Sequence, residues 1–311
     1  MSKDTKRAKI LLDCDPGLDD MFAIFCGLRY CDMVAMTSVA GNVGLEHTTY
    51  NALGLTALAG ANVPVHRGAA RPLNGSDAVD ARHVHGESGL AGIELPSFSG
   101  DIASNDAVGA LFDETAAGDV TVVAVGPLTN IALAIRRDPT WVRRIPRLVI
   151  MGGSTDIGNV TPYAEFNIWA DPEAAAVVFD SGVAITMAGL NLTRQVTMGP
   201  SEIAALRASG TATASTAADG LDFYSDFSLA NYGVKMSAMH DPCAVLEVAR
   251  PDLFQRADMS VNVETTGTHT RGMTVCDQRP NAADPDTDVL IGAEQVSVVS
   301  LIVDAACAPL E

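Results

Sequence analysis

Four aspartates lie within eight residues near the start of the chain, in the stretch DCDPGLDD at positions 13–20, with no lysine or arginine among them. Two carboxylates about 4 Å apart repel each other by about 4 kcal/mol at an effective dielectric constant near 20. A buried group of carboxylates must therefore share protons or hold a cation. Because oxygen ligands favour Ca²⁺ or Mg²⁺ over zinc, the stretch predicts a site for a hard divalent cation.

Two alternatives remain open on these residues alone. The stretch could be a solvated turn in which Asp19 or Asp20 caps a helix. It could also belong to a phosphotransferase in which an aspartate of the D-x-D pattern is the nucleophile. That chemistry needs a cation against the phosphate, and this chain has only four lysines, three of them before residue 10. An EF-hand is excluded, because Ile24 stands where its loop requires glutamate.

Polar residues also follow three other short apolar runs. Asn42 lies in SVAGNV, Thr129 lies in VGPLTN, and residues 152–154 read GGS after an apolar run. In an open parallel sheet, ligands bind in the crevice beyond the carboxyl ends of the strands. These residues are therefore expected to face the same crevice as the aspartates.

Three loops are dense in polar groups: HVHGESGL at 83–90, GNVTPYAEFN at 158–167 and MHDPCA at 239–244. If the second loop is extended, Glu165 and Asn167 project to one side and Phe166 to the other, an arrangement that suits hydrogen bonding to a polyol.

Single residues of these loops also have structural explanations. His85 or His240 alone could be a hydrogen-bonded structural histidine. Asp241 could merely cap a helix, since proline, here the next residue, favours the first helical position.

The elements that must position these residues follow from the apolar pattern. Strands are predicted at KILLDC (9–14), MVAMTSVAGN (33–42), VPVHRG (63–68), VTVVAVGP (120–127), RLVIMGG (147–153) and VAITMAGLN (183–191). Helical patterns closed by glycine lie between them, at 45–60 and 171–182. Strands apolar on both faces and separated by helices predict a doubly wound α/β fold, with a mostly parallel central sheet flanked by helices.

The C-terminal part is predicted to extend this fold with further strands and a helix. Residues 199–250 have a helical pattern, strands are predicted at 259–267, 272–277 and 288–294, and a last helix at 297–307. The Ala/Thr/Ser-rich stretch SGTATASTAADG at 209–220 predicts a mobile surface loop, which could also border a pocket. Since no Pro-rich or charge-rich linker interrupts the chain, a single domain over 1–311 is expected.

Composition narrows the partners and the compartment. A hydrophobic content of 48% with 19% charged residues is typical of a compact globular protein. The net charge of −18 repels phosphate backbones and anionic lipids, so neither a nucleic-acid partner nor a membrane is expected. The six cysteines form no C-x-x-C pair, which predicts reduced thiols and a cytoplasmic location.

In combination, these motifs resemble the nucleoside hydrolase family, the inosine-uridine preferring nucleoside N-ribohydrolases. The resemblance starts at DCDPGLDD and continues in order through VAGN, HGESGL, VGPLTNIA, VIMGG, AEFN, DPEAA, HDPCA and RGMTVCD, so it covers nearly the whole chain. It implies calcium-dependent hydrolysis of the N-glycosidic bond of ribonucleosides, of the inosine, uridine or cytidine type, to free base and ribose. It also implies a homodimer or homotetramer.

The resemblance further assigns roles to individual residues. Calcium would be held by Asp15, Asp20, the backbone carbonyl of Thr129 and Asp241, with a water and the ribose 2′- and 3′-hydroxyls, a set of oxygens that suits Ca²⁺. The substrate would be bound by Asp19, Asn42, His85, Asn159, Glu165, Phe166 and Asn167. Asp13 would orient the metal ligands.

Breaking the ribosyl C1′–N bond builds oxocarbenium character, so the site must supply a nucleophile and stabilise both the cation and the departing nitrogen anion. Asp15 is the expected general base for the attacking water. His240 is the expected acid for the leaving base, with His85 beside it. By resemblance, the presence of both histidines places the chain with inosine-uridine or pyrimidine-preferring branches.

Departures from the family pattern occur at Asn191, where aspartate is common, and at Trp169. The aromatic residues Tyr224, Phe227 and Tyr232 could serve either core packing or base stacking. The alternative function is a non-catalytic, calcium-dependent ribose- or nucleoside-binding protein.

Overall fold

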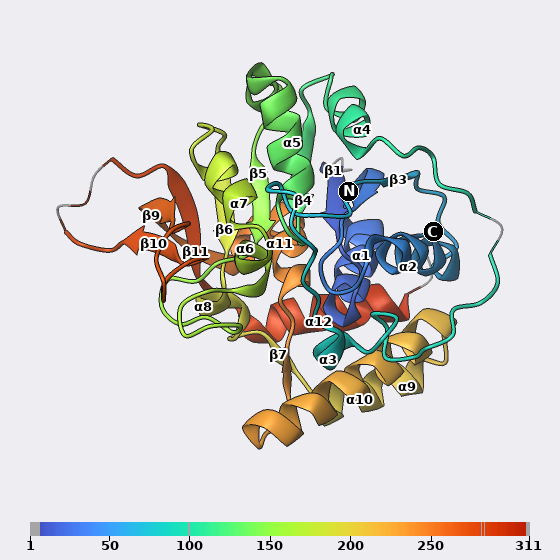
Figure 1. Ribbon diagram of the computed structural model, residues 1–311. Helices are drawn as coiled ribbons and strands as arrows, with labels where there is room; N and C mark the ends of the chain where they lie inside the picture. Colours follow the sequence, from blue (N-terminus) through green and yellow to red (C-terminus); the bar gives the residue numbers. More distant parts are fainter. Residues whose placement is uncertain (1–6, 99, 281, 283, 309–311) are drawn as a thin grey trace, which may run out of the picture.

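A computed structural model of the chain describes residues 7–98, 100–280, 282 and 284–308. The centre of this described part is a nine-stranded sheet in the order β10-β9-β11-β6-β5-β4-β1-β2-β3 (Figure 1). Its strands are β1 (Lys9–Cys14), β2 (Asp32–Ser38), β3 (Val65–Arg67), β4 (Val120–Ala124), β5 (Leu148–Met151), β6 (Ile185–Ala188), β9 (Phe254–Val263), β10 (Thr274–Asp277) and β11 (Thr287–Ala293). Neighbouring strands from β3 to β11 pair in parallel, and β9 runs antiparallel to β10 and β11. The predicted mostly parallel sheet is confirmed.

The remaining elements connect and cover these strands. The helices are α1 (Leu18–Tyr30), α2 (Leu45–Leu58), α3 (Arg82–His85), α4 (Ala107–Glu114), α5 (Thr129–Arg137), α6 (Phe166–Ala170), α7 (Pro172–Phe179), α8 (Leu190–Thr193), α9 (Pro200–Ser209), α10 (Ala212–Tyr232), α11 (Asp241–Ala249) and α12 (Gln295–Cys307). Two short 3₁₀ helices, Pro139–Arg143 and Pro251–Leu253, and the strand pair β7 (Thr197–Met198) and β8 (Ser237–Ala238) complete the set.

Helices pack on both faces of the sheet, as a doubly wound fold requires (Figure 1). Ile10 and Leu12 of β1 belong to a core with α1, α11 and α12, whereas Leu11 belongs to a second core with α5 and α7. Successive side chains of a strand point to opposite faces. Asp13 therefore points to the same face as Leu11, toward α5.

The predicted surface loop at 209–220 is wrong, because α10 begins at Ala212. Thr211 is its N-cap, with Oγ1 accepting a hydrogen bond from Ala214 N at 3.2 Å. Ala214, Ala217 and Ala218 follow at helical spacing and are fully buried. Alanine has the highest helix propensity, so a composition that resembles a linker forms a closely packed helix here.

Most other predicted elements are confirmed, although the bounds of many differ from those predicted. The predicted loops at 83–90 and 158–167 are wrong in part, because α3 begins just before the first of them and ends within it, and α6 begins at the end of the second. Within the part of the chain that the structure describes, no helix is long and apolar enough to cross a bilayer.

Candidate active site

The turn between β1 and α1 lies where the strand order of the sheet reverses. β1 pairs with β2 on one side and with β4 on the other. The helix that follows β1 packs on one face of the sheet, and the helix that follows β4 packs on the opposite face. Such a switch point opens a crevice at the carboxyl ends of the strands, and DCDPGLDD occupies it.

The four aspartates of this turn are buried, the most exposed being Asp19 at 5%. Gly17 is the N-cap of α1, and Asp20 accepts hydrogen bonds from Gly17 N at 2.9 Å and from Asp15 N at 3.2 Å. Asp20 therefore does cap a helix. A solvated acidic turn is nevertheless wrong, since the carboxylates have lost nearly all contact with water.

Asp241, the first residue of α11, joins the aspartates from the other end of the sequence. The carboxylate oxygens of Asp19, Asp20 and Asp241 lie within 4.8 Å of one another, and all three side chains are buried. Burial raises the pKa of Asp20 to about 6 and, together with the charge of Asp20, that of Asp19 to about 8. Burial and the charges of Asp19 and Asp20 raise the pKa of Asp241 well above its usual range. A divalent cation would relieve this repulsion, so the group could bind a metal ion.

Asp15 lies beside this acidic group rather than within it. Its Oδ2 accepts a hydrogen bond from Asn42 N at 2.7 Å, while its buried Oδ1 accepts none from the described residues. Glycines make room for the carboxylate, because a Cβ would lie 2.0 Å from Oδ2 at Gly41 and 2.6 Å from Oδ1 at Gly126. A buried acceptor without a donor is costly. A cation or water at Oδ1 fits this atom, and the role of Asp15 as ligand and base stays a prediction.

Asn42, a predicted ribose contact, holds two of these carboxylates. Its Nδ2 donates to Asp20 Oδ2 at 3.0 Å and to the Asp15 carbonyl at 3.2 Å. The side chain therefore fixes the geometry of the β1–α1 turn from the loop between β2 and α2.

Asp13 points away from the acidic group, as the pleat of β1 requires. Its Oδ1 accepts hydrogen bonds from Thr37 Oγ1 at 2.5 Å and Asn130 Nδ2 at 2.7 Å. Burial raises its pKa to about 7. Neither partner is a proposed metal ligand, so the orienting role that the family resemblance implies stays a prediction.

Glu165 is the N-cap of α6, so Phe166 and Asn167 are helical and the condition of an extended segment is not met. Its Oε1 accepts from Asn167 N at 2.9 Å, and its Oε2 accepts from Gly153 N at 3.0 Å and Ile168 N at 3.2 Å. The cap satisfies backbone N–H groups that have no partner inside the helix. Burial raises the pKa of Glu165 to about 7.

Asn167 lies beneath the same crevice, at the ends of β4 and β5. Its Nδ2 donates to Val125 O at 2.8 Å and Met151 O at 3.1 Å. The start of α6 therefore brings Glu165 and Asn167 to the ends of β4 and β5.

Two other predicted substrate contacts are less enclosed. Asn159 is exposed on the loop before α6. Phe166 is half-buried, with its ring centroid 6.4 Å from that of Trp169. Neither belongs to the buried acidic group.

Thr129, the first residue of α5, is buried at the strand ends. Its hydroxyl donates to Asp171 Oδ2 at 2.6 Å. The DPEAA motif, which begins with Asp171, thus contacts a proposed metal ligand, a link that sequence reasoning missed.

The two histidines lie near each other on α3 and at the N-cap of α11. Leu18 N donates to His85 Nδ1 at 3.0 Å, which leaves the proton on Nε2. His240 Nδ1 lies 2.7 Å from Thr193 Oγ1. Burial lowers the pKa of His240 to about 4 and, together with the charge of His240, that of His85 to about 3. Both imidazoles are therefore neutral in the free protein near neutral pH.

The aromatic residues of α10 divide into two environments. Tyr224 is buried, with its ring centroid 5.9 Å from that of His85. The ring centroid of Phe227 lies 6.2 Å from that of His83 and 6.5 Å from that of Tyr232. Tyr232 is 71% exposed. Only Tyr224 of these three is enclosed beside a predicted site residue.

The departure at Asn191 has a structural reason. Asn191 Nδ2 donates to Leu290 O at 2.9 Å and so ties α8 to β11. An ionised aspartate has no proton to donate there.

Sequence reasoning did not identify two polar residues that contact predicted site residues. Thr193 contacts His240, and Asn130, which directly follows Thr129, donates to Asp13.

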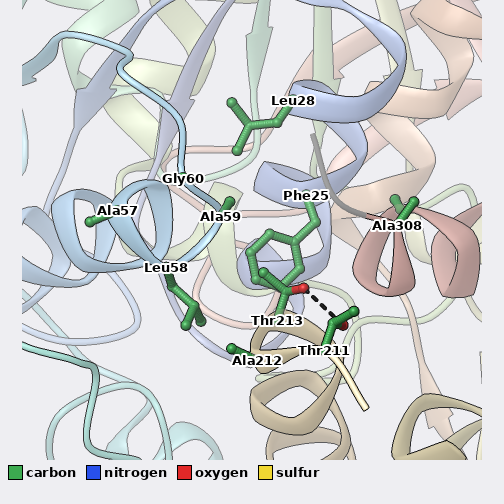
Figure 2. A pocket seen from close by; sticks show the side chains of 11 residues that line it. Phe25, Leu28, Ala57, Leu58, Ala59, Gly60, Thr211, Ala212, Thr213 and Ala308 are labelled. Atoms are coloured by element: carbon green, nitrogen blue, oxygen red, sulfur yellow. Dashed lines mark hydrogen bonds between the residues drawn. The ribbon is translucent and has the colours of Figure 1, made fainter. Parts of the chain in front are cut away.

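A pocket of about 330 Å³ lies away from this site, between α1, the end of α2, the start of α10 and the end of α12 (Figure 2). Small and apolar residues form most of its lining. Its two hydroxyl groups, on Thr211 and Thr213, lie 3.3 Å apart, and Thr213 also donates to Ala306 O. None of the predicted site residues lines it.

Comparisons with known proteins agree with the geometry. Residues 10–301 match the family model described as inosine-uridine preferring nucleoside hydrolase. The pyrimidine-specific ribonucleoside hydrolase RihA of Enterobacter sp. (strain 638) is 40% identical over 302 residues, which cover 95% of this chain and 96% of that protein. RihA of Citrobacter koseri is 39% identical over 307 residues, covering 95% of this chain and 96% of that protein.

Two solved structures share the fold and more than a quarter of the sequence. A plant nucleoside hydrolase, PpNRh1, superposes with a TM-score of 0.89 and 31% identity over 97% of this chain and 100% of that chain. A purine-preferring ribonucleoside hydrolase from Gardnerella vaginalis superposes with a TM-score of 0.91 and 30% identity over 96% of this chain and 98% of that chain.

Proposed function

The chain belongs to the inosine-uridine preferring nucleoside hydrolase family, and from this premise we propose a calcium-dependent mechanism in which Asp15 deprotonates the attacking water. As a family member, the protein hydrolyses the N-glycosidic bond of ribonucleosides to free base and ribose. The observation that carries the metal part of the proposal is the buried group of Asp19, Asp20 and Asp241, whose oxygens lie within 4.8 Å of one another.

The donor set fits calcium. Asp15, Asp20, Asp241 and the Thr129 carbonyl would hold it, and Asp15 Oδ1 is a buried acceptor without a donor among the described residues. Ca²⁺ takes about six to eight oxygen ligands and tolerates irregular geometry. When bound, the cation lowers the pKa of a nearby water and offsets the charge of the carboxylates.

Asp15 suits the role of general base. Burial and the charge of Asp20 raise its pKa well above the usual range in the metal-free site. Calcium bound beside it would favour the ionised carboxylate, which is the form that can accept a proton from water. Asn42 N holds one carboxylate oxygen at 2.7 Å and so fixes the orientation of Asp15.

Other carboxylates and amides of the site would bind the ribose. Asp19 and Glu165 place negative charge where the sugar develops oxocarbenium character. Asn167 uses Nδ2 on two backbone carbonyls, so its Oδ1 remains to accept a hydrogen bond from a ribose hydroxyl.

His240 would assist the departure of the base. Its Nδ1 lies 2.7 Å from Thr193 Oγ1, so a hydroxyl that donates to Nδ1 leaves the proton on Nε2. Since burial lowers its pKa to about 4, the neutral ring would act by donating a hydrogen bond to the nitrogen as negative charge develops on it.

We propose that the enzyme prefers pyrimidine ribonucleosides as substrates. Two pyrimidine-specific relatives are 40% and 39% identical to this chain, while a purine-preferring hydrolase is 30% identical. Enclosure of Tyr224 beside His85 restricts the space on that side of the site.

The proposal also includes a single domain, a cytoplasmic location and a homo-oligomer. Free thiols at all six cysteines support a reducing compartment.

The test is incubation with uridine, cytidine, inosine, adenosine, guanosine and a deoxyribonucleoside control, with the free base quantified before and after calcium chelation. We expect the fastest release from uridine or cytidine and loss of activity with the chelator. Activity that survives chelation would refute the metal requirement, and calcium binding without release of any base would favour a nucleoside-binding protein.

A further inference from the structure

Arg194 directly follows α8 and fastens a loop of the site to that helix. Its Nη2 donates to Gly158 O at 2.7 Å, and its Nη1 lies 3.3 Å from Ile157 O. The preceding residue, Thr193, contacts His240 Nδ1 at 2.7 Å. Two successive residues therefore connect the histidine proposed to assist the leaving base with the loop that precedes α6.

That loop is a compact turn over residues 157–164. Gly158 N donates to Pro162 O at 3.0 Å, and Asn159 N donates to Ala164 O at 3.1 Å. A Cβ on Gly158 would lie 2.3 Å from Ala164 O, so only glycine fits this close approach. These bonds define the shape of the turn but not its place relative to the rest of the site.

An isolated antiparallel bridge between Ala164 and Met273 holds the end of the turn, and contacts with α8 hold its start. Besides Arg194, Asn191 Oδ1 accepts from Thr155 N, but at the longer distance of 3.4 Å. The guanidinium is a rigid planar fork, which suits two adjacent carbonyl oxygens better than an ammonium group does. Arg194 is thus the stronger of these two attachments.

We propose that Arg194 is a positioning residue that holds the turn 157–164 so that Asn159 reaches the ribose hydroxyls. This inference rests on the proposed function, because the ribose contact of Asn159 is part of it. The contacts of Arg194 with the turn are made to backbone carbonyls. Loss of Arg194 therefore weakens ribose binding more than it slows the chemical step.

The first test separates KM from kcat. Arg194→Met retains the length of the side chain and removes both donors, and we expect it to raise KM for uridine about tenfold with kcat changed less than about threefold. Arg194→Lys keeps one charged donor and should give a smaller rise. Arg250→Met is the matched control. Arg250 lies at the C-terminal end of α11, whereas His240 lies at its N-terminal end, and the Arg250 guanidinium pairs with Asp252 at 2.8 Å. This control variant should leave KM unchanged.

A double-mutant cycle tests whether the effect passes through Asn159. In an Asn159→Ala background, Arg194→Met should add little to the rise in KM. If the two residues acted independently, their separate fold-changes in KM would multiply. A multiplied effect overturns the proposal, as does an unchanged KM for Arg194→Met. If Arg194→Met does not fold, Gly158→Ala disturbs the same turn, and an unchanged KM for that variant overturns the proposal.

Hydrogen exchange gives a readout that does not need turnover. Backbone amides of 157–164 should exchange faster in Arg194→Met than in the wild type, and equal exchange refutes the attachment. Absence of base release from the wild type would instead refute the proposed function, and the exchange result would still decide whether Arg194 positions the turn.

Discussion

The hydroxyl of Thr129 donates a hydrogen bond to the carboxylate of Asp171, with 2.6 Å between Oγ1 and Oδ2. Both residues are buried, at 3% and 1% exposure. The same Oδ2 accepts from Leu73 N at 2.7 Å, and Oδ1 accepts from Ala174 N at 3.0 Å. Asp171 therefore joins the starts of α5 and α7. Because the proposed metal ligand of Thr129 is its backbone carbonyl, the side chain is available to fix the orientation of the residue.

We expect Thr129→Val to weaken calcium binding by about tenfold or more, since partners that orient metal ligands typically have effects of this size. The substitution keeps the shape of the side chain and removes its donor, so Asp171 loses one of its hydrogen bonds. Titration calorimetry on chelator-treated protein measures the affinity. Thr129→Ser retains the hydroxyl and should bind nearly as the wild type does. Equal affinity for Thr129→Val would exclude an orienting role.

Asp15→Asn should lower kcat by roughly 10²-fold to 10⁴-fold, the range expected for loss of general-base catalysis. The amide cannot accept a proton from water, yet its oxygen can still accept from Asn42 N. Single-turnover release of uracil from uridine, measured alongside the unfolding temperature, checks the effect. A near-normal rate in a folded variant would show that another group takes the proton.

Local sequence patterns predict most of the strands and helices of the fold. KILLDC is apolar on both faces and forms β1 over the predicted residues, Lys9–Cys14, and the Asp13 side chain falls on the face that the pleat dictates. The prediction of a loop at 209–220 was wrong because the small residues there resemble a linker. The stretch is helical because its alanines pack against the core, a tertiary effect that the local sequence does not show.

For the site, sequence reasoning identified groups of residues but not their hydrogen-bond partners. The family resemblance implies that Asp20 and Asp241 meet, and the structure brings their carboxylates together. The Thr129–Asp171 bond spans 42 residues of sequence, and the Thr193–His240 contact spans 47. Threonine at these positions has no local pattern to mark it, so only the packing of helices against each other reveals these contacts.

Gly126→Ala should damage catalysis while leaving the fold in place. A Cβ at this position would lie 2.6 Å from Asp15 Oδ1 and 2.9 Å from Val39 Cγ1, so the carboxylate must move. We expect at least a tenfold fall in kcat, because small displacements of a catalytic group are costly. Gly44→Ala is the matched control, since no atom lies within 4 Å of a Cβ built there. Similar activities for the two variants would contradict tight packing around Asp15.

Calcium should stabilise the fold more strongly as the pH rises. In the metal-free protein, burial raises the pKa of Asp13 from 3.8 to about 7 and that of Glu165 from 4.5 to about 7. Between about pH 4 and pH 8 the folded state holds protons that the unfolded chain has released, so its stability falls as the pH rises through this window. Bound calcium offsets the carboxylate charge, and binding competes with protons. Thermal unfolding at about pH 5 and about pH 8, with calcium or with chelator, measures the difference in unfolding temperature between the two forms. A difference that is smaller at the higher pH would contradict this linkage.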